Sequence, residues 1–136
     1  MDYILWQWLF SNSVAPQGTA KFRILTIKKP KKAKSTKTSQ KFQEISNSER
    51  PVLIDYFATW CQPCRVQSSV LVTVKEQVGD AARIIKIDID QYPAIASEYN
   101  VRGVPTLAIF KNGQLLWKES GVHDVNTLTN LLKQYQ

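Results

Sequence analysis

The chain has 136 residues, 43% of them hydrophobic and 21% charged, a size that suits one domain with one core. Its formal net charge of +7 is segregated: residues 1–41 carry nine basic residues and one acid, and residues 42–136 carry nine basic and ten acidic residues. The composition argues against a nucleic-acid-binding surface on the larger part of the chain, and a total of two cysteines argues against a disulfide-stapled secreted domain.

Residues 1–41 are predicted to form a basic, disordered extension that is dispensable for folding. The apolar run Tyr3–Phe10 is much shorter than the roughly 20 residues that span a bilayer, and Asp2 stands where a signal peptide carries positive charge. Residues 28–41 are rich in Lys, Ser and Thr without an acid, which favours a solvated linker. Contact with a membrane surface and attraction to nucleic acid stay open as functional alternatives for this segment.

Strand and helix patterns alternate along the rest of the chain. Residues 22–27 have the pattern of an additional edge strand, and residues 52–58 have that of a buried central strand, although the acid Asp55 interrupts it. A helical stripe of apolar residues begins after Cys61 and ends at Gly79. The remaining predicted elements are a short helix at 42–47, a strand at 83–90, a helix at 93–99, a hairpin of strands 106–110 and 115–118, and a last helix capped by Asp124. This order predicts an α/β fold in which helices cover both faces of a mixed sheet.

The only two cysteines form the motif Cys61-Gln-Pro-Cys64, directly after the predicted central strand. Two thiols three residues apart at the start of a helix can close a disulfide, and the order strand–CxxC–helix is typical of a redox dithiol. Zinc sites use the same spacing, but a structural site needs about four ligands and the rest of the chain offers only His123. A purely structural disulfide is also disfavoured, because so short a loop removes little chain entropy. We therefore expect a redox-active pair with no metal and no other cofactor.

The two thiols are expected to differ in reactivity. Thiol–disulfide exchange needs a thiolate, and a free cysteine with a pKa of about 8.5 is mostly protonated at neutral pH. Cys61 is expected at the first helical turn, where unpaired N–H groups and the helix dipole favour an anion and lower the pKa toward about 7. Cys64 lies one turn further along and is expected to be more buried. Cys61 is thus the predicted nucleophile and Cys64 the predicted resolving thiol.

Four stretches resemble the thioredoxin family, in the family's order and close to its spacing. They correspond to the central strand and active-site turn, the following strand, the loop that carries a cis-proline, and the hairpin of the last two strands, at residues 52–64, 86–90, 101–106 and 110–113. The resemblance implies a thioredoxin fold, a three-layer α/β/α arrangement with a central mixed β-sheet. It covers residues 42–136, whereas residues 1–41 have no counterpart.

The resemblance also assigns roles to residues outside the motif. It places the family's buried acid at Asp55 and its partnering lysine at Lys86. A buried carboxyl with a raised pKa can accept the proton of Cys64 during resolution; a carboxylate occupied by structural partners is the alternative. A cis-peptide bond before Pro105 would leave the backbone groups of Val104 free to pair with an extended substrate.

Other residues are predicted to surround the substrate. Trp60 is expected to shield the thiols, Gln62 and Pro63 to lie beside them, and Gly121 to let a partner backbone approach closely. Gln62 replaces the glycine usual in the family, which leaves the reduction potential open. Ser68 and Ser69 stand where the family commonly has a helix-kinking proline.

The predicted function is reduction of protein disulfides through Cys61 and Cys64, with recycling by a thioredoxin reductase-like flavoprotein. A tethered or exported reductase is a narrower variant, and a non-catalytic binding module or subunit is the alternative from another class. We expect a cytoplasmic monomer whose folded domain has no nucleic-acid partner. Membrane association or export through residues 1–41 is the alternative location.

Overall fold

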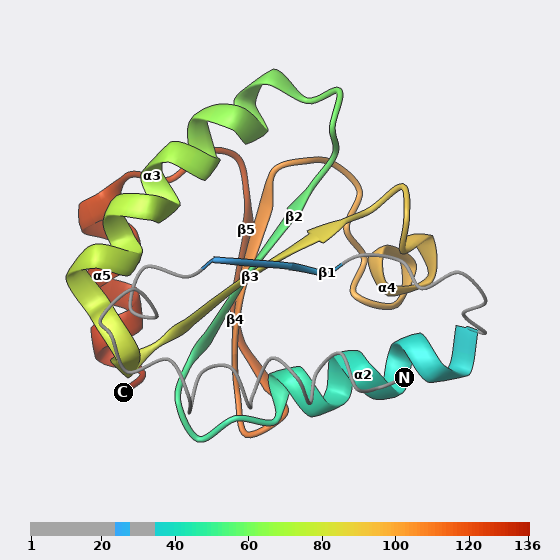
Figure 1. Cartoon of the computed structure of the whole chain (residues 1–136), viewed down its shortest axis with the longest axis horizontal. Helices are drawn as coiled ribbons and strands as arrows, with labels where there is room; N and C mark the ends of the chain where they lie inside the picture. Colours follow the sequence, from blue (N-terminus) through green and yellow to red (C-terminus); the bar gives the residue numbers. More distant parts are fainter. Residues whose placement is uncertain (1–23, 28–34) are drawn as a thin grey trace.

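The computed structural model describes residues 24–27 and 35–136, and within these ranges one five-stranded sheet forms the centre of the molecule (Figure 1). The strand order is β1-β3-β2-β4-β5. β3 runs parallel to both β1 and β2, whereas β4 is antiparallel to β2 and to β5. The strands are β1 (Leu25–Ile27), β2 (Val52–Phe57), β3 (Arg83–Asp88), β4 (Thr106–Lys111) and β5 (Gln114–Ser120).

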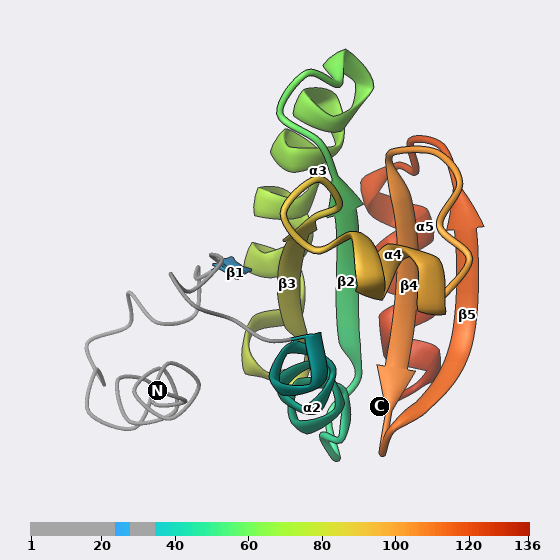
Figure 2. The same cartoon turned by 90° about the vertical axis from the view of Figure 1, so that its right-hand side faces the viewer.

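Helices cover both faces of this sheet, so the predicted three-layer α/β/α arrangement is confirmed (Figure 2). One face carries α3 (Gln62–Val78) and α5 (Val125–Gln134), and the other carries α2 (Ser35–Ser46) and α4 (Pro93–Glu98). A single 3-10 turn, Gly79–Ala81, follows α3. The backbone φ of +57° at Gly79 is one that glycine adopts without strain, which explains why α3 ends there.

Alternation along β2 divides the core into two layers. Ile54 and Tyr56 point toward α2 and α4, whereas Leu53 packs with residues of α3 and α5. Because side chains alternate along a strand, Asp55 shares the face of Leu53 and therefore points toward α3. In the parallel register of β2 and β3, Asp55 is the partner of Lys86, so both side chains lie on this face at the same level.

Two predictions at the start of the domain need correction or extension. The helix predicted at 42–47 begins at Ser35, so residues 35–41 are helical and do not form the predicted linker. Their polar sequence has no apolar stripe; the helix depends on the buried anchors Phe42 and Ile45, from which the preceding turns extend. The edge strand predicted at 22–27 is confirmed for Leu25–Ile27, which pairs with β3.

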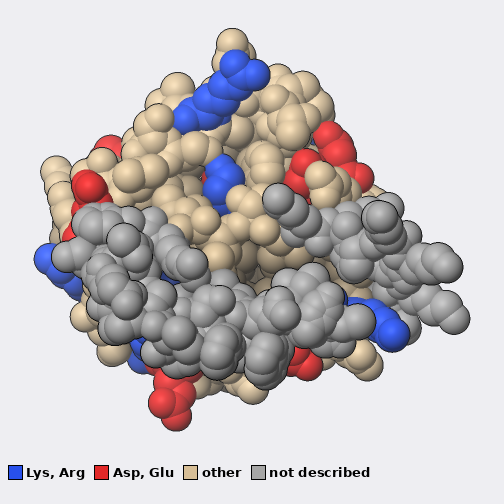
Figure 3. All heavy atoms as spheres, in the orientation of Figure 1, with Lys and Arg blue, Asp and Glu red and all other residues tan. Residues whose placement is uncertain are grey.

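β1 and most of α2 lie within residues 1–41, and β1 pairs with β3; that residues 1–41 are dispensable for folding and disulfide reduction stays a prediction. Residues 1–23 and 28–34 are outside the described residues, and the disorder predicted there stays a prediction. In the described part no helix is long and apolar enough to cross a membrane. On the face seen in Figure 3, the described Lys, Arg, Asp and Glu side chains are scattered among uncharged surface and form no extended patch of one sign.

Candidate active site

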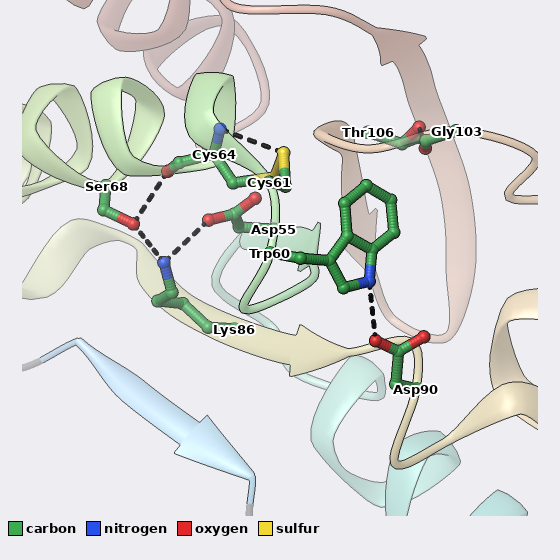
Figure 4. The surroundings of a disulfide bond; sticks show 9 residues. All are labelled: Asp55, Trp60, Cys61, Cys64, Ser68, Lys86, Asp90, Gly103 and Thr106. Atoms are coloured by element: carbon green, nitrogen blue, oxygen red, sulfur yellow. Dashed lines mark hydrogen bonds and ion pairs between the residues drawn. A yellow bond between two sulfur atoms is a disulfide. The ribbon is translucent and has the colours of Figure 1, made fainter.

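The two cysteines lie beyond the C-terminal end of the central strand β2, where a short loop leads into α3 (Figure 4). They form a disulfide with a Cα–Cα distance of 5.3 Å. Cys61 is the N-cap of α3, and its Sγ accepts a hydrogen bond of 3.1 Å from the backbone N–H of Cys64. Pro63 occupies the first turn, where no N–H is required. The helix N-terminus thus provides the environment for a sulfur anion that the sequence predicted.

The predicted difference in exposure between the two cysteines does not appear in this oxidised state. Cys61 is 3% exposed and Cys64 is 2% exposed. Both pack with Ala58, and the partly buried Val104 contacts the same cluster. Their distinction therefore rests on position along the helix, since only the sulfur of Cys61 receives the N–H of the first turn.

Asp55 and Lys86 form the predicted pair behind the disulfide (Figure 4). The Asp55 side chain is fully buried, and Lys86 Nζ lies 3.1 Å from its Oδ2, while the Lys86 side chain is 14% exposed. This contact is an ion pair by distance, but neither carboxyl oxygen has a hydrogen-bond partner of good geometry in the described part of the chain. Burial therefore outweighs Lys86: loss of hydration raises the pKa of Asp55, and the nearby ammonium lowers it only in part.

Ser68 connects this pair to the cysteine helix, a link that the sequence analysis did not predict. Lys86 Nζ donates to the Ser68 hydroxyl, which in turn donates to the carbonyl of Cys64 over 3.0 Å. The position of Ser68 four residues after Cys64 was the available signal, because such residues share one helix face. Its partner Lys86 is on another strand, which helical spacing does not reveal.

Trp60 is 68% exposed, so it is not part of the core. Its indole Nε1 donates to Asp90 Oδ2 over 2.9 Å, and this bond holds the side chain beside the disulfide (Figure 4). Asp90 was predicted to end the strand at 83–90, and its contact with Trp60 was not predicted; β3 in fact ends at Asp88. Gln62, between the two cysteines, is exposed at the start of α3.

The loop before β4 brings the other predicted substrate contacts to the disulfide. The Val104–Pro105 peptide bond is cis, as the resemblance implied. Neither backbone polar group of Val104 bonds to another residue in the described ranges. The Pro105 carbonyl accepts from the N–H of Gly121 over 2.9 Å. Gly121 has a φ of +100° and open space where a side chain would stand; the close approach of a partner backbone there stays a prediction.

The segment after Gly121 is fixed to the cysteine helix by a buried glutamine. The Gln67 side chain accepts from the His123 N–H over 2.7 Å and donates to the His123 carbonyl over 3.2 Å. The His123 ring lies 2.9 Å from Glu119 Oε2 and 3.0 Å from the Gly121 carbonyl. Across residues 24–27 and 35–136, no group of three or more His, Cys, Asp or Glu side chains is arranged to hold a metal ion.

A dithiol at a helix N-terminus, a buried carboxyl behind it and a cis-proline loop in front of it define a dithiol–disulfide oxidoreductase. A sequence model of the family Thioredoxin matches residues 33–134. "Thioredoxin 1" of Synechococcus elongatus is 39% identical over 93 residues, which cover 68% of this chain and 87% of that protein. "Thioredoxin" of Porphyra purpurea is 40% identical over 93 residues, which again cover 68% of this chain and 87% of that protein.

Solved structures agree with these sequence comparisons. A mutant thioredoxin from Halobacterium salinarum superposes with a TM-score of 0.70 at 31% identity, covering 85% of this chain and 92% of that one. Oxidised mitochondrial thioredoxin 3 from Saccharomyces cerevisiae gives a TM-score of 0.67 at 27% identity, covering 82% and 94%. The chain belongs to the thioredoxin family. Its function is that of a protein-disulfide reductase that works by dithiol–disulfide exchange.

Proposed function

We propose that Cys61 is the nucleophile of this reductase and Cys64 the resolving cysteine. The observation that carries this assignment is the hydrogen bond from the Cys64 N–H to Cys61 Sγ at the N-cap of α3. In the reduced protein the same N–H and the helix dipole stabilise a thiolate on Cys61. The Cys64 sulfur receives no such bond and stays a thiol until the second step.

The reaction then has two balanced exchanges. The Cys61 thiolate attacks one sulfur of a substrate disulfide, forms a mixed disulfide and releases the other substrate sulfur as a thiolate. Cys64 next loses its proton and attacks Cys61 Sγ, which breaks the mixed disulfide and releases the second substrate thiolate. The protein ends with the Cys61–Cys64 disulfide, and the substrate has gained two electrons and takes up two protons.

Asp55 is the proposed acceptor of the Cys64 proton, directly or through one water molecule. A buried carboxyl with a raised pKa is matched to this exchange better than an exposed one, because general bases work best with a pKa near the operating pH. Lys86 is the proposed partner that keeps enough of the carboxyl ionised to act as a base.

The substrate is proposed to bind as an extended segment in front of the disulfide. The free backbone groups of Val104 would pair with its main chain, next to the cis bond of Pro105. Trp60, Gln62, Pro63 and Gly121 would form the rest of the contact surface. The unpaired backbone supplies affinity without side-chain specificity, which suits a reductase that acts on many proteins.

Two variants test the assignment of the cysteines. In insulin reduction with dithiothreitol, Cys61→Ser is expected to lose turnover, whereas Cys64→Ser should accumulate a mixed disulfide that mass spectrometry detects. Alkylation of the reduced wild type at neutral pH should modify Cys61 first. Trapping by Cys61→Ser or first labelling of Cys64 would reverse the roles, and undiminished turnover of Cys61→Ser would favour a binding module.

A thioredoxin reductase-like flavoprotein is the proposed source of electrons, and the chain is proposed to act as a monomer. Because Gln62 leaves the reduction potential open, its measurement is informative: a value near about −270 mV would support a reductant, and one near about −120 mV an oxidant.

We propose the cytoplasm as the compartment of the protein, since the two cysteines form the redox pair and no structural disulfides accompany them. Two relatives, "Thioredoxin Y2, chloroplastic" of Arabidopsis thaliana and "Thioredoxin Y, chloroplastic" of rice, are named for another compartment. Imaging of the tagged full chain would therefore test the proposed location.

A further inference from the structure

The Lys86 ammonium is held between three side chains, two from β2 and one from α3. It lies 3.1 Å from Asp55 Oδ2 and 4.6 Å from the centre of the Phe57 ring, and it donates to the hydroxyl of Ser68. The Ser68 hydroxyl in turn donates a hydrogen bond of 3.0 Å to the carbonyl of Cys64. A continuous chain of polar contacts thus runs from Asp55 to the backbone of the resolving cysteine (Figure 4).

The position of the ammonium depends on more than Asp55. A lysine has a flexible four-carbon stem and a strongly hydrated head group, so it readily turns toward water unless several acceptors hold it. The Lys86 side chain is partly exposed, whereas Asp55 is fully buried. Ser68 supplies a hydroxyl that accepts a hydrogen bond from this ammonium, whereas neither oxygen of Asp55 has a hydrogen-bond partner among the described residues.

We propose that Ser68 is a positioning residue for proton transfer: its hydroxyl holds the Lys86 ammonium against Asp55 and fixes it relative to Cys64. This inference rests on the proposed role of Asp55 as the acceptor of the Cys64 proton. Ser68 itself touches neither the substrate nor a reacting atom, and it acts through Lys86.

The groups that face Asp55 make the direction of the effect predictable. Lys86 of β3 is the charged group acting on it, α3 contributes Ser68 and the cysteines, and β4 contributes the uncharged register partner Leu107. Removing the Ser68 hydroxyl lets the ammonium move toward water and makes the surroundings of Asp55 less polar. Both changes raise the pKa of Asp55 further. Since resolution needs the ionised carboxyl, its pH dependence moves to higher pH.

The chain contains a matched control for this test. Ser69 is the neighbouring serine of α3, and its hydroxyl makes the same type of bond to a carbonyl one turn back, that of Arg65 at 3.4 Å, but it is exposed. We would compare Ser68→Ala with Ser69→Ala, and with Ser68→Thr, which keeps a hydroxyl. Carbon-13 NMR would follow the Asp55 carboxyl in the oxidised proteins, where the cysteines do not titrate. Stopped-flow absorbance would follow release of the two thiolates of Ellman's reagent by the reduced proteins.

Ser68→Ala should make Asp55 titrate at higher pH, while Ser69→Ala should not and Ser68→Thr should restore the wild-type titration. At neutral pH the second thiolate release should slow by about three- to tenfold, a part of the ~10²-fold or more that a positioned base contributes. The first release should be unchanged, and the deficit should disappear at alkaline pH. An unshifted Asp55 titration in Ser68→Ala, or an equal shift in Ser69→Ala, would overturn the inference.

Asp55→Asn distinguishes this failure from failure of the underlying proposal. If Asp55→Asn leaves the second release as fast as in the wild type, Asp55 is not the proton acceptor, and both the proposed role and the inference fall. If Asp55→Asn slows that release but Ser68→Ala neither shifts the titration nor changes the pH dependence, only the inference about Ser68 falls.

Discussion

The two faces of the sheet bury different kinds of side chain. The face under α2 and α4 is apolar and aromatic: Phe42, Tyr99 and Phe110 form a triangle with ring centroids 4.8 to 5.4 Å apart. The face under α3 and α5 has an equally buried aliphatic core but also encloses Asp55 and Gln67. The polar groups gather near the N-terminal half of α3, where the disulfide lies.

Two tyrosine hydroxyls are the buried polar groups of interest on the aromatic face. The hydroxyls of Tyr56 and Tyr92 have no hydrogen-bond partner among the described residues. Burial raises the pKa of both phenols, to about 12 for Tyr92, so neither ionises at physiological pH. These two buried polar groups of the aromatic face are therefore neutral phenols, whereas the other face buries the ionisable Asp55 next to Lys86.

Removing a large aromatic side chain from the first face should give the largest loss of stability. Phe42→Ala leaves a cavity in the aromatic triangle and is expected to lower the free energy of unfolding by about 3–5 kcal/mol. Insulin reduction well below the melting temperature should change little, since Phe42 is remote from the disulfide. Urea unfolding measures the first effect, and Val66→Ala, at an exposed position of α3, is the control. A stable but inactive Phe42→Ala would break the contrast between the faces.

Truncation tests whether the same face depends on the segment before Phe42. A chain of residues 42–136 lacks β1 and most of α2, whereas a chain of residues 24–136 keeps both. The half-buried Leu25 and Ile27 alone bury apolar area worth about 2 kcal/mol, so the shorter chain should unfold at a lower urea concentration. Equal midpoints for the two chains would show that residues 24–41 are dispensable after all.

The smallest expected change in stability concerns Asp55 and depends on pH. Its folded-state pKa is raised, so the native protein holds this proton more tightly than the unfolded chain does, and stability falls as pH rises from the unfolded through the folded pKa. Asp55→Ala removes this dependence and should stabilise the oxidised protein by about 1–2 kcal/mol above that range, with little gain below it.

Urea unfolding of oxidised wild type and Asp55→Ala at two pH values measures this difference, with Glu76→Ala as a control at an exposed acid of α3. Asp55→Ala, but not the control variant, should also release the second thiolate of Ellman's reagent more slowly. A variant that is clearly less stable than the wild type at the higher pH would identify Asp55 as a structural partner of Lys86.

Most of the fold was predictable because its elements are recorded in local patterns. The apolar run of β2, the stripe of α3 ending at Gly79, and the cap at Asp124, whose Oδ1 accepts from the Thr127 N–H over 2.9 Å, all depend on residues close in sequence. The resemblance to thioredoxins supplied what patterns alone do not give, including the cis bond at Pro105 and the pairing of Asp55 with Lys86.

By itself, the sequence determined the redox chemistry of this protein. Two cysteines three positions apart at the start of a helix, directly after a strand, are typical of a redox dithiol, and the two sulfurs do form a disulfide. The tertiary structure decided which groups surround it. The polar start of α2 is helical because Phe42 and Ile45 are anchored in the core. Ser68 of α3 meets Lys86 of β3, 18 residues away, because α3 packs against this face of the sheet. Such non-local contacts leave no periodic trace in the chain.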